Sequence, residues 1–501
     1  MKWLDALLDR ITMYRLLLYY LIGLLAAATI LSALGILQYQ PLTIIFSSLF
    51  LTAVCWVSNK VFAWAFDAPT NVESSFITAL ILALILTPAQ APNTAIFLAA
   101  AAGLAIASKY MLAIRGRHIF NPVAIAVVLT SFGAGDSASW WVGTAPMLPF
   151  VLAGGILVVR RIRRVAMTSW YIGATLAATA VFALITGGDV LAVLQKEVLS
   201  TALFFAAFVM LTEPLTSPTT KQNQAWYAGL TGALTAPQAH FGGFYFTPEL
   251  ALLVGNIFSY IVGPRVKVRL HLKERVALTG DSFDFVFTPE RPFAYQPGQY
   301  MEFTLQHPKT DMRGARRYFT LASSPTEQDM RVGVKFYQPC SSYKRWLYNL
   351  QPNTPLIATQ LGGDFTLPKD PARKLAFIAG GIGVTPFRSM LKYLVDTNQQ
   401  RDIAMIYGAK TAADLVYRDV LEAARQKLGA HIIYALGSGG VQPPMYTTRI
   451  TGSLIKQVIP DYAERLFYVS GPHDMVVATQ EALRNLGVPK HNVKKDFFSG
   501  Y

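Results

Sequence analysis

Charged residues and cysteines are both scarce in this sequence of 501 residues. Asp, Glu, Lys and Arg make up 15% of it, against about 25% in an ordinary soluble protein, while 53% of its residues are hydrophobic. This composition excludes a wholly soluble chain and predicts a membrane part. The two cysteines, Cys55 and Cys340, cannot form a disulfide framework, and two thiolates are too few for a four-cysteine iron–sulfur cluster.

Histidine is also scarce, because only His118 and His240 fall within the first 264 residues. A stack of haems in the membrane needs more axial ligands than this, so a transmembrane haem relay is disfavoured. The formal net charge is +15, and residues 265–501 hold 31 basic and 20 acidic side chains. No block of Lys and Arg interleaved with aromatics points to nucleic acid. We expect the basic tail to lie beside an anionic leaflet and to bind pyrophosphates, and we expect no metal site.

Long apolar runs occupy the chain up to Pro264, and a spanning helix needs about 20 apolar residues. The runs predict an α-helical membrane bundle of about ten spans, several of them short enough to be tilted or re-entrant. The expected spans are roughly 14–38, 42–66, 74–90, 94–113, 119–133, 147–160, 167–187, 198–214, 226–240 and 248–263.

The loop charges predict the orientation of this bundle. An even number of spans places both ends of the bundle on one side, and twelve basic residues then fall on the side of the N-terminus, against Lys196 alone on the other. The positive-inside rule therefore places the N-terminus and the soluble tail in the cytoplasm, with the bundle multi-pass in a bacterial-type inner (plasma) membrane. The stretch MKWLDALLDRITMYR lacks a small-residue cleavage site, so we expect a cytoplasmic amphipathic lead-in and not a removable signal.

Three polar stretches interrupt the apolar runs, at residues 116–122, 212–219 and 249–256. In the first, Asn121 is placed to cap a helix that has Pro122 at its first position. The second puts Glu213 at the end of an apolar helix, which is costly unless the carboxylate is solvated or paired. The third puts Asn256 inside a span. Each stretch alone is more often structural than functional.

Together, the first two stretches resemble a known family. Gly-Arg-x-Ile-Phe-Asn-Pro followed by Thr-Glu-Pro-Leu-Thr-x-Pro about ninety residues later is similar to the membrane subunit shared by the sodium-pumping NADH:quinone reductase (its B subunit) and the Rnf complex (its D subunit). The resemblance covers roughly 40–264. It implies a ten-span bundle that holds FMN or riboflavin in the membrane, with Asn121 and Thr216 as candidate cofactor-binding residues.

That family typically attaches one FMN to a Thr in an Asp-x-x-Ser-Gly-Ala-Thr motif on the outer side. Here the corresponding region runs from Asp136 to Pro146 and lacks the Ser-Gly-Ala-Thr string, although Thr144 follows a Gly. Thr144 is therefore the candidate attachment point, and noncovalent flavin is the expectation. The neighbouring Trp140 and Trp141 fit either a flavin wall or an interfacial aromatic belt.

The soluble half changes pattern once along its length. Residues 266–370 contain six strand-like runs with turn signals between them, which predicts a small antiparallel β-barrel. Residues 374–501 alternate short apolar strands with helical patterns, which predicts a parallel α/β sheet. The expected domains are a membrane bundle at 1–264, a β-barrel at 265–372 and a nucleotide-binding domain at 373–501.

The stretch from Arg316 to Pro325 contains the spacing Arg-x-aromatic-Thr on a predicted strand. Successive strand side chains alternate, so Arg317 and Phe319 should share one face while Tyr318 and Thr320 share the other. A pyrophosphate needs a planar cation, and an isoalloxazine ring needs an aromatic neighbour and a polar partner for its N5 edge. Alone, an edge strand with a solvated Arg is the simpler interpretation.

The order of barrel, then sheet, and the motifs in them resemble the ferredoxin–NADP reductase-like flavoproteins over essentially all of 266–501. The Pro-Gly-Gln-aromatic turn at 297–300 matches, as does the Arg-x-aromatic-Thr strand, with Phe319 where Tyr is commoner. The resemblance implies an FAD domain in which Arg317 binds the pyrophosphate, Phe319 lies by the ring and Thr320 bonds near N5. These last two are the candidate catalytic residues. Further FAD-binding candidates are Tyr318, Lys335 and Ser342.

The nicotinamide-nucleotide site is expected at a Gly-rich turn between a strand and a helix. Glycines let the backbone approach a pyrophosphate, and the helix N-terminus favours its charge. By the same resemblance a second turn lies beside the nicotinamide, with Ser470 replacing the usual Cys, and an aromatic near the chain end covers the flavin. The residues implied are Gly380, Gly381, Gly383, Thr385, Pro386, Gly471, Pro472 and Phe498. A disordered chain end is the competing interpretation for Phe498.

The cofactor is expected to be NADH and not NADPH, because residues 436–442 hold no Lys or Arg for a 2′-phosphate. The function expected is transfer of electrons from NAD(P)H through FAD to a membrane flavin, then to a quinone or an outer-face acceptor. One alternative is a redox-driven transporter of sodium or protons, with Glu213, Asp67 and Glu73 on the ion path. Another is a membrane-anchored reductase of soluble acceptors. Expected partners are membrane lipid, the quinone or other acceptor, and further electron-transfer proteins.

Overall fold

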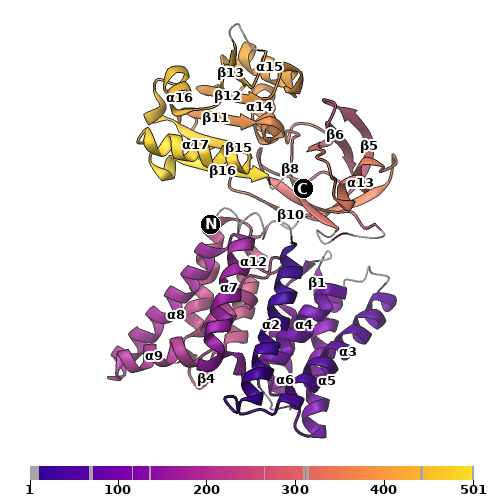
Figure 1. The fold of residues 1–501 in the computed structure, drawn as a ribbon, viewed down its shortest axis with the longest axis vertical. Helices are drawn as coiled ribbons and strands as arrows, with labels where there is room; N and C mark the ends of the chain where they lie inside the picture. Colours follow the sequence, from indigo (N-terminus) through magenta and orange to yellow (C-terminus); the bar gives the residue numbers. More distant parts are fainter. Residues whose placement is uncertain are drawn as a thin grey trace. The chain divides into compact units, whose positions relative to one another are not determined.

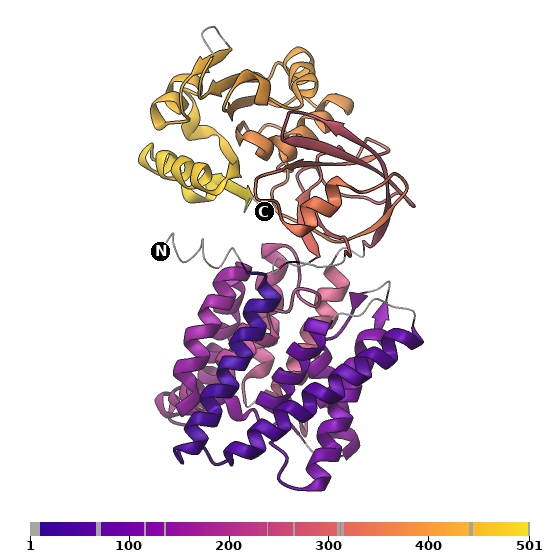
Figure 2. The same cartoon turned by 45° about the vertical axis from the view of Figure 1, so that its right-hand side comes forward.

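The computed structural model describes residues 11–66, 72–114, 117–134, 137–237, 239–263, 266–307, 311, 315–439 and 444–498. The chain divides into two compact units, Met1–Arg265 and Val266–Tyr501 (Figures 1 and 2). The first unit is helical and the second is built on two sheets. Each unit is described by itself.

Unit 1 is a bundle of helices joined by short turns (Figure 1). Proline occupies the first turn of α3, α5, α6 and α12, where its missing N–H costs nothing. The helices are α2 Met13–Ala33, α3 Pro41–Ala65, α4 Val72–Ile85, α5 Pro92–Met111, α6 Pro122–Ala134, α7 Leu148–Ile162, α8 Val165–Ile185, α9 Val190–Ser200, α10 Leu203–Phe205, α11 Lys221–Thr235 and α12 Pro248–Val262. Short 3₁₀ turns η1 Trp141–Gly143 and η2 Ala145–Met147 precede α7, the π-helix η3 Ala206–Met210 follows α10, and two hairpins pair β1 Ala113–Ile114 with β2 Arg117–His118 and β3 His240–Phe241 with β4 Phe244–Tyr245.

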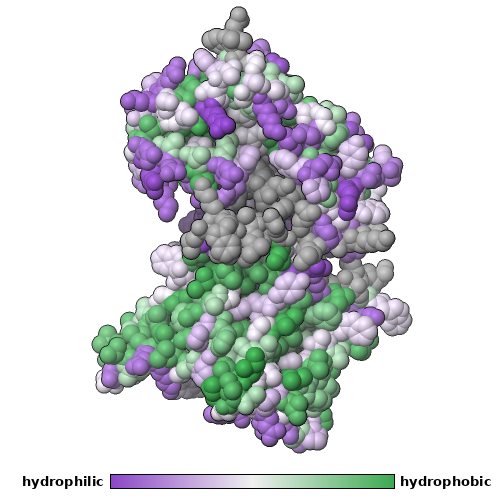
Figure 3. All heavy atoms as spheres, viewed as in Figure 1, coloured by the Kyte–Doolittle hydropathy of each residue, from purple (hydrophilic) through white to green (hydrophobic). Residues whose placement is uncertain are grey.

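Five described helices are long and apolar enough to cross a membrane, or six if one bent pair is a single span. On the face seen in Figure 3, hydrophobic residues cover most of this unit. Each of the ten predicted spans contains a helix, but the segment predicted at 198–214 is broken, because α9 and the helix at Leu203–Met210 meet at 59°. The segment predicted at 226–240 belongs to a helix that begins earlier, at Lys221, and ends at Thr235. Ten complete spans stay a prediction.

Unit 2 begins with a six-stranded antiparallel sheet in the order β8-β7-β10-β5-β6-β9. All six predicted runs form strands, which are β5 Val268–Ala277, β6 Ser282–Pro289, β7 Tyr300–Thr304, β8 Arg316–Thr320, β9 Met330–Lys335 and β10 Pro355–Gly362, with α13 Ser342–Tyr348 between β9 and β10. The outer strands β8 and β9 are linked just beyond β8, where Ala322 N donates to Arg331 O at 2.8 Å. A fully closed barrel stays a prediction.

A six-stranded parallel sheet follows, in the order β14-β13-β12-β11-β15-β16. The strands are β11 Leu375–Gly380, β12 Ile403–Ala409, β13 His431–Leu436, β14 Met445–Thr447, β15 Leu466–Pro472 and β16 Val493–Phe498, and the four runs predicted as parallel strands are confirmed as β11, β12, β13 and β15. The helices are α14 Thr385–Asp396, α15 Arg418–Leu428, α16 Gly452–Val458 and α17 His473–Asn485. Alternate residues of β11 enter two cores, one with α14 and α15 and one with α16 and α17, so helices cover both faces of the sheet.

Candidate functional site

The Gly-rich turn lies where β11 ends at the centre of the parallel sheet. Gly381 has a left-handed φ of +53°, and a Cβ added to it would meet no atom within 4 Å. A left-handed backbone favours glycine, and the open space beside it lets a ligand approach the main chain. The turn leads directly into α14, whose first residues are Thr385 and Pro386. The geometry fits a pyrophosphate at the carboxyl edge of a parallel sheet.

A second turn packs backbone against backbone with the first. A Cβ on Gly383 would lie 2.5 Å from Gly471 Cα, and one on Gly471 would lie 3.1 Å from Gly380 Cα. Only glycine permits this approach, so the two turns predicted from sequence do meet. Ser470, just before the second turn, has a fully buried hydroxyl with no hydrogen-bond partner among the described residues. Because that hydroxyl is enclosed by the protein, it gives no direct support for a contact with the nicotinamide.

The chain end lies on the same side of this sheet. β16 runs parallel to β15, with Phe498 opposite Pro472 in the register. This places the Phe498 backbone beside the second turn. The side chain of Phe498 lies outside the described part of the structure.

The strand β8 shows the predicted alternation of faces. Arg317 and Phe319 both contact Tyr343, with the guanidinium carbon 5.0 Å from its ring centroid and the two rings 6.1 Å apart. Tyr318 points elsewhere, because its hydroxyl donates to Gln360 Oε1 at 2.8 Å and its ring meets Tyr300. A planar cation and an aromatic ring therefore share one face, which is the arrangement that a flavin dinucleotide needs.

The remaining residues predicted to contact FAD are buried or already have partners within the protein. Thr320 is buried at the end of β8. Lys335 forms an ion pair with Asp281 at 3.0 Å. Ser342 donates its backbone N–H to Asp311 Oδ2 at 2.8 Å, so a carboxylate stands where the resemblance placed pyrophosphate. A phosphate at Ser342 would have to displace that carboxylate.

Asn121 in unit 1 caps α6, as expected, and its Oδ1 accepts from Val123 N and Ala124 N at 3.0 and 3.1 Å. Its own N–H donates to Asn256 Oδ1 at 2.8 Å, and Asn256 Nδ2 donates to Thr216 O at 3.5 Å. The three polar stretches of the sequence therefore meet at one buried junction.

One charged side chain lies at this junction, and others in unit 1 have their own partners. Glu213 accepts from Thr216 Oγ1 at 2.9 Å and lies 3.6 Å from His118 Nε2. Glu73 pairs with Arg15 at 2.6 Å, and Lys109 Nζ donates to oxygens of Ser74 and Thr78 on α4. Asp67 lies outside the described residues. The carboxylates suggested for an ion path are thus paired, which is also how structural charges behave.

Thr144 lies between η1 and η2, and its Oγ1 is buried without a hydrogen-bond partner among the described residues. A buried oxygen is a poor acceptor for phosphoester attachment, so this geometry does not fit covalent FMN. Trp140 donates from Nε1 to the buried Glu249 at 3.1 Å, and Trp141 donates to backbone oxygens of α4 and Leu86. Both rings are therefore held by the protein itself.

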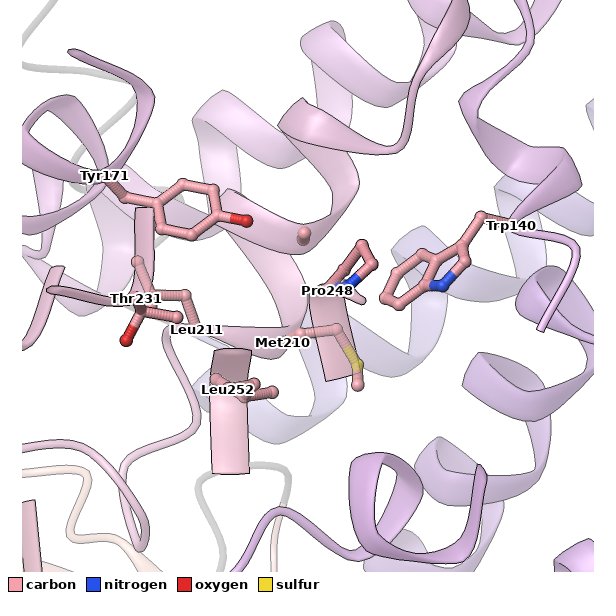
Figure 4. A pocket seen from close by; sticks show the side chains of 8 residues that line it. Trp140, Tyr171, Met210, Leu211, Thr231, Pro248 and Leu252 are labelled. Atoms are coloured by element: carbon pink, nitrogen blue, oxygen red, sulfur yellow. The ribbon is translucent and has the colours of Figure 1, made fainter. Parts of the chain in front are cut away.

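A small cavity adjoins Trp140. Figure 4 shows the rings of Trp140 and Tyr171 on opposite sides of it, with Pro248 between them. Its volume of about 10 Å³ holds roughly one water molecule. An isoalloxazine ring does not fit there, so this cavity gives no support to a flavin at this place.

The chain was compared with known families and proteins. Residues 139–268 match the family described as NQR2, RnfD, RnfE, and residues 377–481 match the oxidoreductase NAD-binding domain. The chain is 28% identical over 228 residues to the glycine betaine monooxygenase reductase subunit of Chromohalobacter salexigens, a match that covers 44% of this chain and 61% of that protein. It is 32% identical over 193 residues to an NADPH oxidoreductase of Mycobacterium tuberculosis, covering 37% and 47%.

Among solved structures, the FAD/NAD-binding domain of a nitric oxide dioxygenase from Vibrio cholerae aligns with a TM-score of 0.42 at 19% identity, covering 46% of this chain and 98% of that one. The chain spans less than two-thirds of the length of the first curated relatives.

Over the matched residues, the second unit is therefore similar to the oxidoreductase NAD-binding domain and to reductase components. One chain carries both a region that matches the NQR2, RnfD, RnfE family and a region that matches the oxidoreductase NAD-binding domain, so the combination predicted from two sets of motifs is confirmed. The membrane match begins at residue 139, and the resemblance of residues 40–138 stays a prediction.

Sequence reasoning missed one group of residues in unit 2. Arg388 on α14 is buried and bonded to Glu327 in the turn between β8 and β9. The available signal was an arginine that directly follows Phe387 on an amphipathic helix. Its partner could not be identified without the fold, because Glu327 is 61 residues away.

Proposed function

We propose that the chain passes electrons from NAD(P)H through FAD to a flavin held by unit 1, and from there to a quinone or an outer-face acceptor. The observation that best supports this route is the joining of a reductase NAD-binding domain to an NQR2/RnfD/RnfE domain in one chain. FAD supplies the conversion between hydride and single-electron chemistry, and the protein supplies binding and orientation.

The FAD site is proposed at β8. Arg317 would hold the pyrophosphate, Phe319 would lie beside the ring and Thr320 would bond near N5. Support comes from the shared face of Arg317 and Phe319 against Tyr343. Tyr318, Lys335 and Ser342 are assigned more peripheral contacts, since each already has a partner in the protein.

The nicotinamide site is proposed at the paired glycine turns. Gly380, Gly381 and Gly383, with Thr385 and Pro386, would receive the pyrophosphate and ribose, while Gly471 and Pro472 would flank the nicotinamide and Phe498 would cover the flavin. The open space at Gly381 supports this role. The helix that follows adds the positive end of its dipole.

NADH is proposed as the preferred donor, because Leu436–Gly439 carries no cation. A lysine does lie beside that segment, because Ser438 N donates to the backbone oxygen of Lys410, the residue after β12, at 3.1 Å. A cation there would favour NADPH if its side chain reached a 2′-phosphate. Comparing the catalytic efficiency with NADH and NADPH tests the preference, and a higher efficiency with NADPH would overturn it.

Unit 1 is proposed to be a ten-span bundle in a bacterial-type inner membrane, with its N-terminus and the reductase in the cytoplasm. Noncovalent FMN or riboflavin is proposed within it, with Asn121, Thr216 and Thr144 as candidate contacts. The family match over 139–268 supports a membrane flavin, and the charge distribution among loops supports the orientation.

A redox-driven ion transporter is the second candidate, favoured by Glu213 at the polar junction, which lies between Thr216 and His118. Sodium-dependent NADH oxidation in reconstituted vesicles would support it. A membrane-anchored reductase of soluble acceptors is the third candidate, since relatives include reductase components of monooxygenases. Flavin analysis separates this one, because an anchored reductase needs FAD alone.

The test of the proposed route is the flavin content of the purified full chain, divided into FAD, free FMN or riboflavin, and acid-stable flavin. We expect one FAD and one further acid-extractable flavin, both reduced by NADH. FAD alone would replace the route with the anchored reductase.

A further inference from the structure

A buried arginine joins the two sheets of unit 2 at the proposed reaction centre. Arg388 lies in the first turn of α14 and is 5% exposed. Its Nη1 donates to Glu327 Oε2 at 2.5 Å and to Ala322 O at 2.8 Å, while its Nη2 donates to Glu327 Oε1 at 2.9 Å. A guanidinium that holds both oxygens of one carboxylate fixes orientation as well as distance.

This contact connects the two proposed binding elements over a short path. Ala322 comes two residues after Thr320, the last residue of the flavin strand, and Arg388 comes four residues after Val384, the end of the glycine turn. The neighbouring Ser389 reinforces the connection, because its hydroxyl donates to Ser323 O at 2.5 Å. Any shift of α14 is therefore transmitted to the end of β8.

A second contact brings the same turn against β9. Gly333 lies so close to it that an added Cβ would meet Thr385 Cγ2 at 2.7 Å, Ile382 Cδ1 at 3.1 Å and Tyr417 Oη at 2.5 Å. Tyr417 in turn donates to the buried Asp284 Oδ1 at 3.1 Å. The glycine turn is thus fixed on two sides by strands of the antiparallel sheet.

We infer that Arg388 and Glu327 are positioning residues for hydride transfer, fixing the glycine turn relative to the flavin strand. The inference rests on the proposed function. The reaction served moves one hydride, two electrons with one proton, from NAD(P)H to the flavin, leaving NAD(P)⁺ and two-electron-reduced flavin. Neither residue touches the reacting atoms. Their effect is geometric, and a displacement of about 1 Å is enough to slow a positioned reaction about 100-fold.

The first variant is Arg388→Lys, which keeps the positive charge but cannot donate two parallel hydrogen bonds to one carboxylate. Arg465→Lys is the matched control, because Arg465 is similarly buried and pairs with Asp461 and Asp402. It lies at the amino end of β15, away from the carboxyl ends of the strands where the glycine turns lie. In the full chain with its flavins, we expect Arg388→Lys to slow flavin reduction at saturating NADH at least tenfold, with NADH affinity within about twofold. Deuterated NADH should show a larger isotope effect. Equal slowing in both variants would overturn the inference.

The second variant separates positioning from stability. Replacing both partners of a buried ion pair with apolar side chains is often neutral for stability. In Arg388→Met with Glu327→Met we therefore expect thermal unfolding and FAD content near those of the wild type, with flavin reduction still slow. Recovery of the rate together with stability would show that the pair is only structural. Loss of FAD from the variants would also contradict the inference, because it would make the pair part of the flavin site.

A measurement on the protein without its flavins completes the test. In the flavin-stripped full chain, amide hydrogen exchange in peptides covering 320–327 and 382–389 should quicken in Arg388→Lys and not in Arg465→Lys. Unchanged exchange there would contradict the inference. Failure of this inference can be told apart from failure of the proposed function. A wild-type chain that carries no FAD would refute the proposed function, independently of the hydrogen exchange measured in the variants.

Discussion

The binding role of the glycine turn is tested by placing the same methyl group at two left-handed glycines. Gly381 lies in the turn with φ +53°, and Gly429 ends α15 with φ +66°. A Cβ at either would meet no protein atom within 4 Å. Gly381→Ala and Gly429→Ala therefore carry only the cost of a left-handed alanine, about 1 kcal/mol, which is about 2–4 °C in midpoint for a unit of this size.

Only one of these methyl groups would lie where the dinucleotide is proposed to bind. Intrusion into a packed contact costs about 1–3 kcal/mol, so Gly381→Ala should raise the KM for NADH about fivefold or more. Gly429→Ala should leave it unchanged. Steady-state NADH oxidation with an artificial acceptor measures both, and thermal unfolding confirms that the two variants are equally stable. An equal KM in the two variants would refute the placement of the dinucleotide at this turn.

Three further predictions follow from the contacts. Arg317→Ala should remove FAD and NADH oxidation, measured on the purified protein, whereas Arg316→Ala should retain both; normal activity in Arg317→Ala would end the assignment. Burial raises the pKa of Glu327, but the hydrogen bonds and charge of its arginine partner outweigh burial, so the folded pKa lies below the ordinary value of 4.5. This carboxylate therefore contributes stability above pH 4.5, and that stability is lost as pH falls through the folded pKa. As pH is lowered below 4.5, the unfolding midpoint of Glu327→Gln should fall less than that of the wild type, and parallel curves would contradict this. Asn256→Leu should destabilise unit 1 by about 1–3 kcal/mol, because it leaves the buried N–H of Asn121 unpaired; an unchanged unfolding midpoint in detergent would show that the bond contributes nothing.

Local patterns predicted much of unit 2. Strand-like runs between turn signals identified the antiparallel strands, and short apolar runs identified the parallel ones. Gly381 and Gly383 could be read as a turn because a strand precedes them and a helix follows. The facing of Arg317 and Phe319 followed from strand geometry alone. These features depend on neighbouring residues, which is why the sequence reveals them.

Long-range partners were beyond the reach of such patterns. The sequence marked Asn121, Thr216 and Asn256 as polar interruptions without showing that they meet at one junction. It also gave no reason to join Arg388 to Glu327. Hydropathy showed where helices form in unit 1 but not that the helix at Leu203–Met210 meets α9 at 59°, since that angle depends on packing against other helices.

The central claim is that electrons from NAD(P)H reach a second flavin in the membrane unit of the same chain. The most direct measurement is anaerobic reduction of the purified full chain by NADH, followed by separate extraction of its flavins. The account predicts one FAD and one further flavin that is not FAD, with absorbance changes that correspond to reduction of both. A chain that holds FAD alone, or a second flavin that stays oxidised while FAD is reduced, would contradict it.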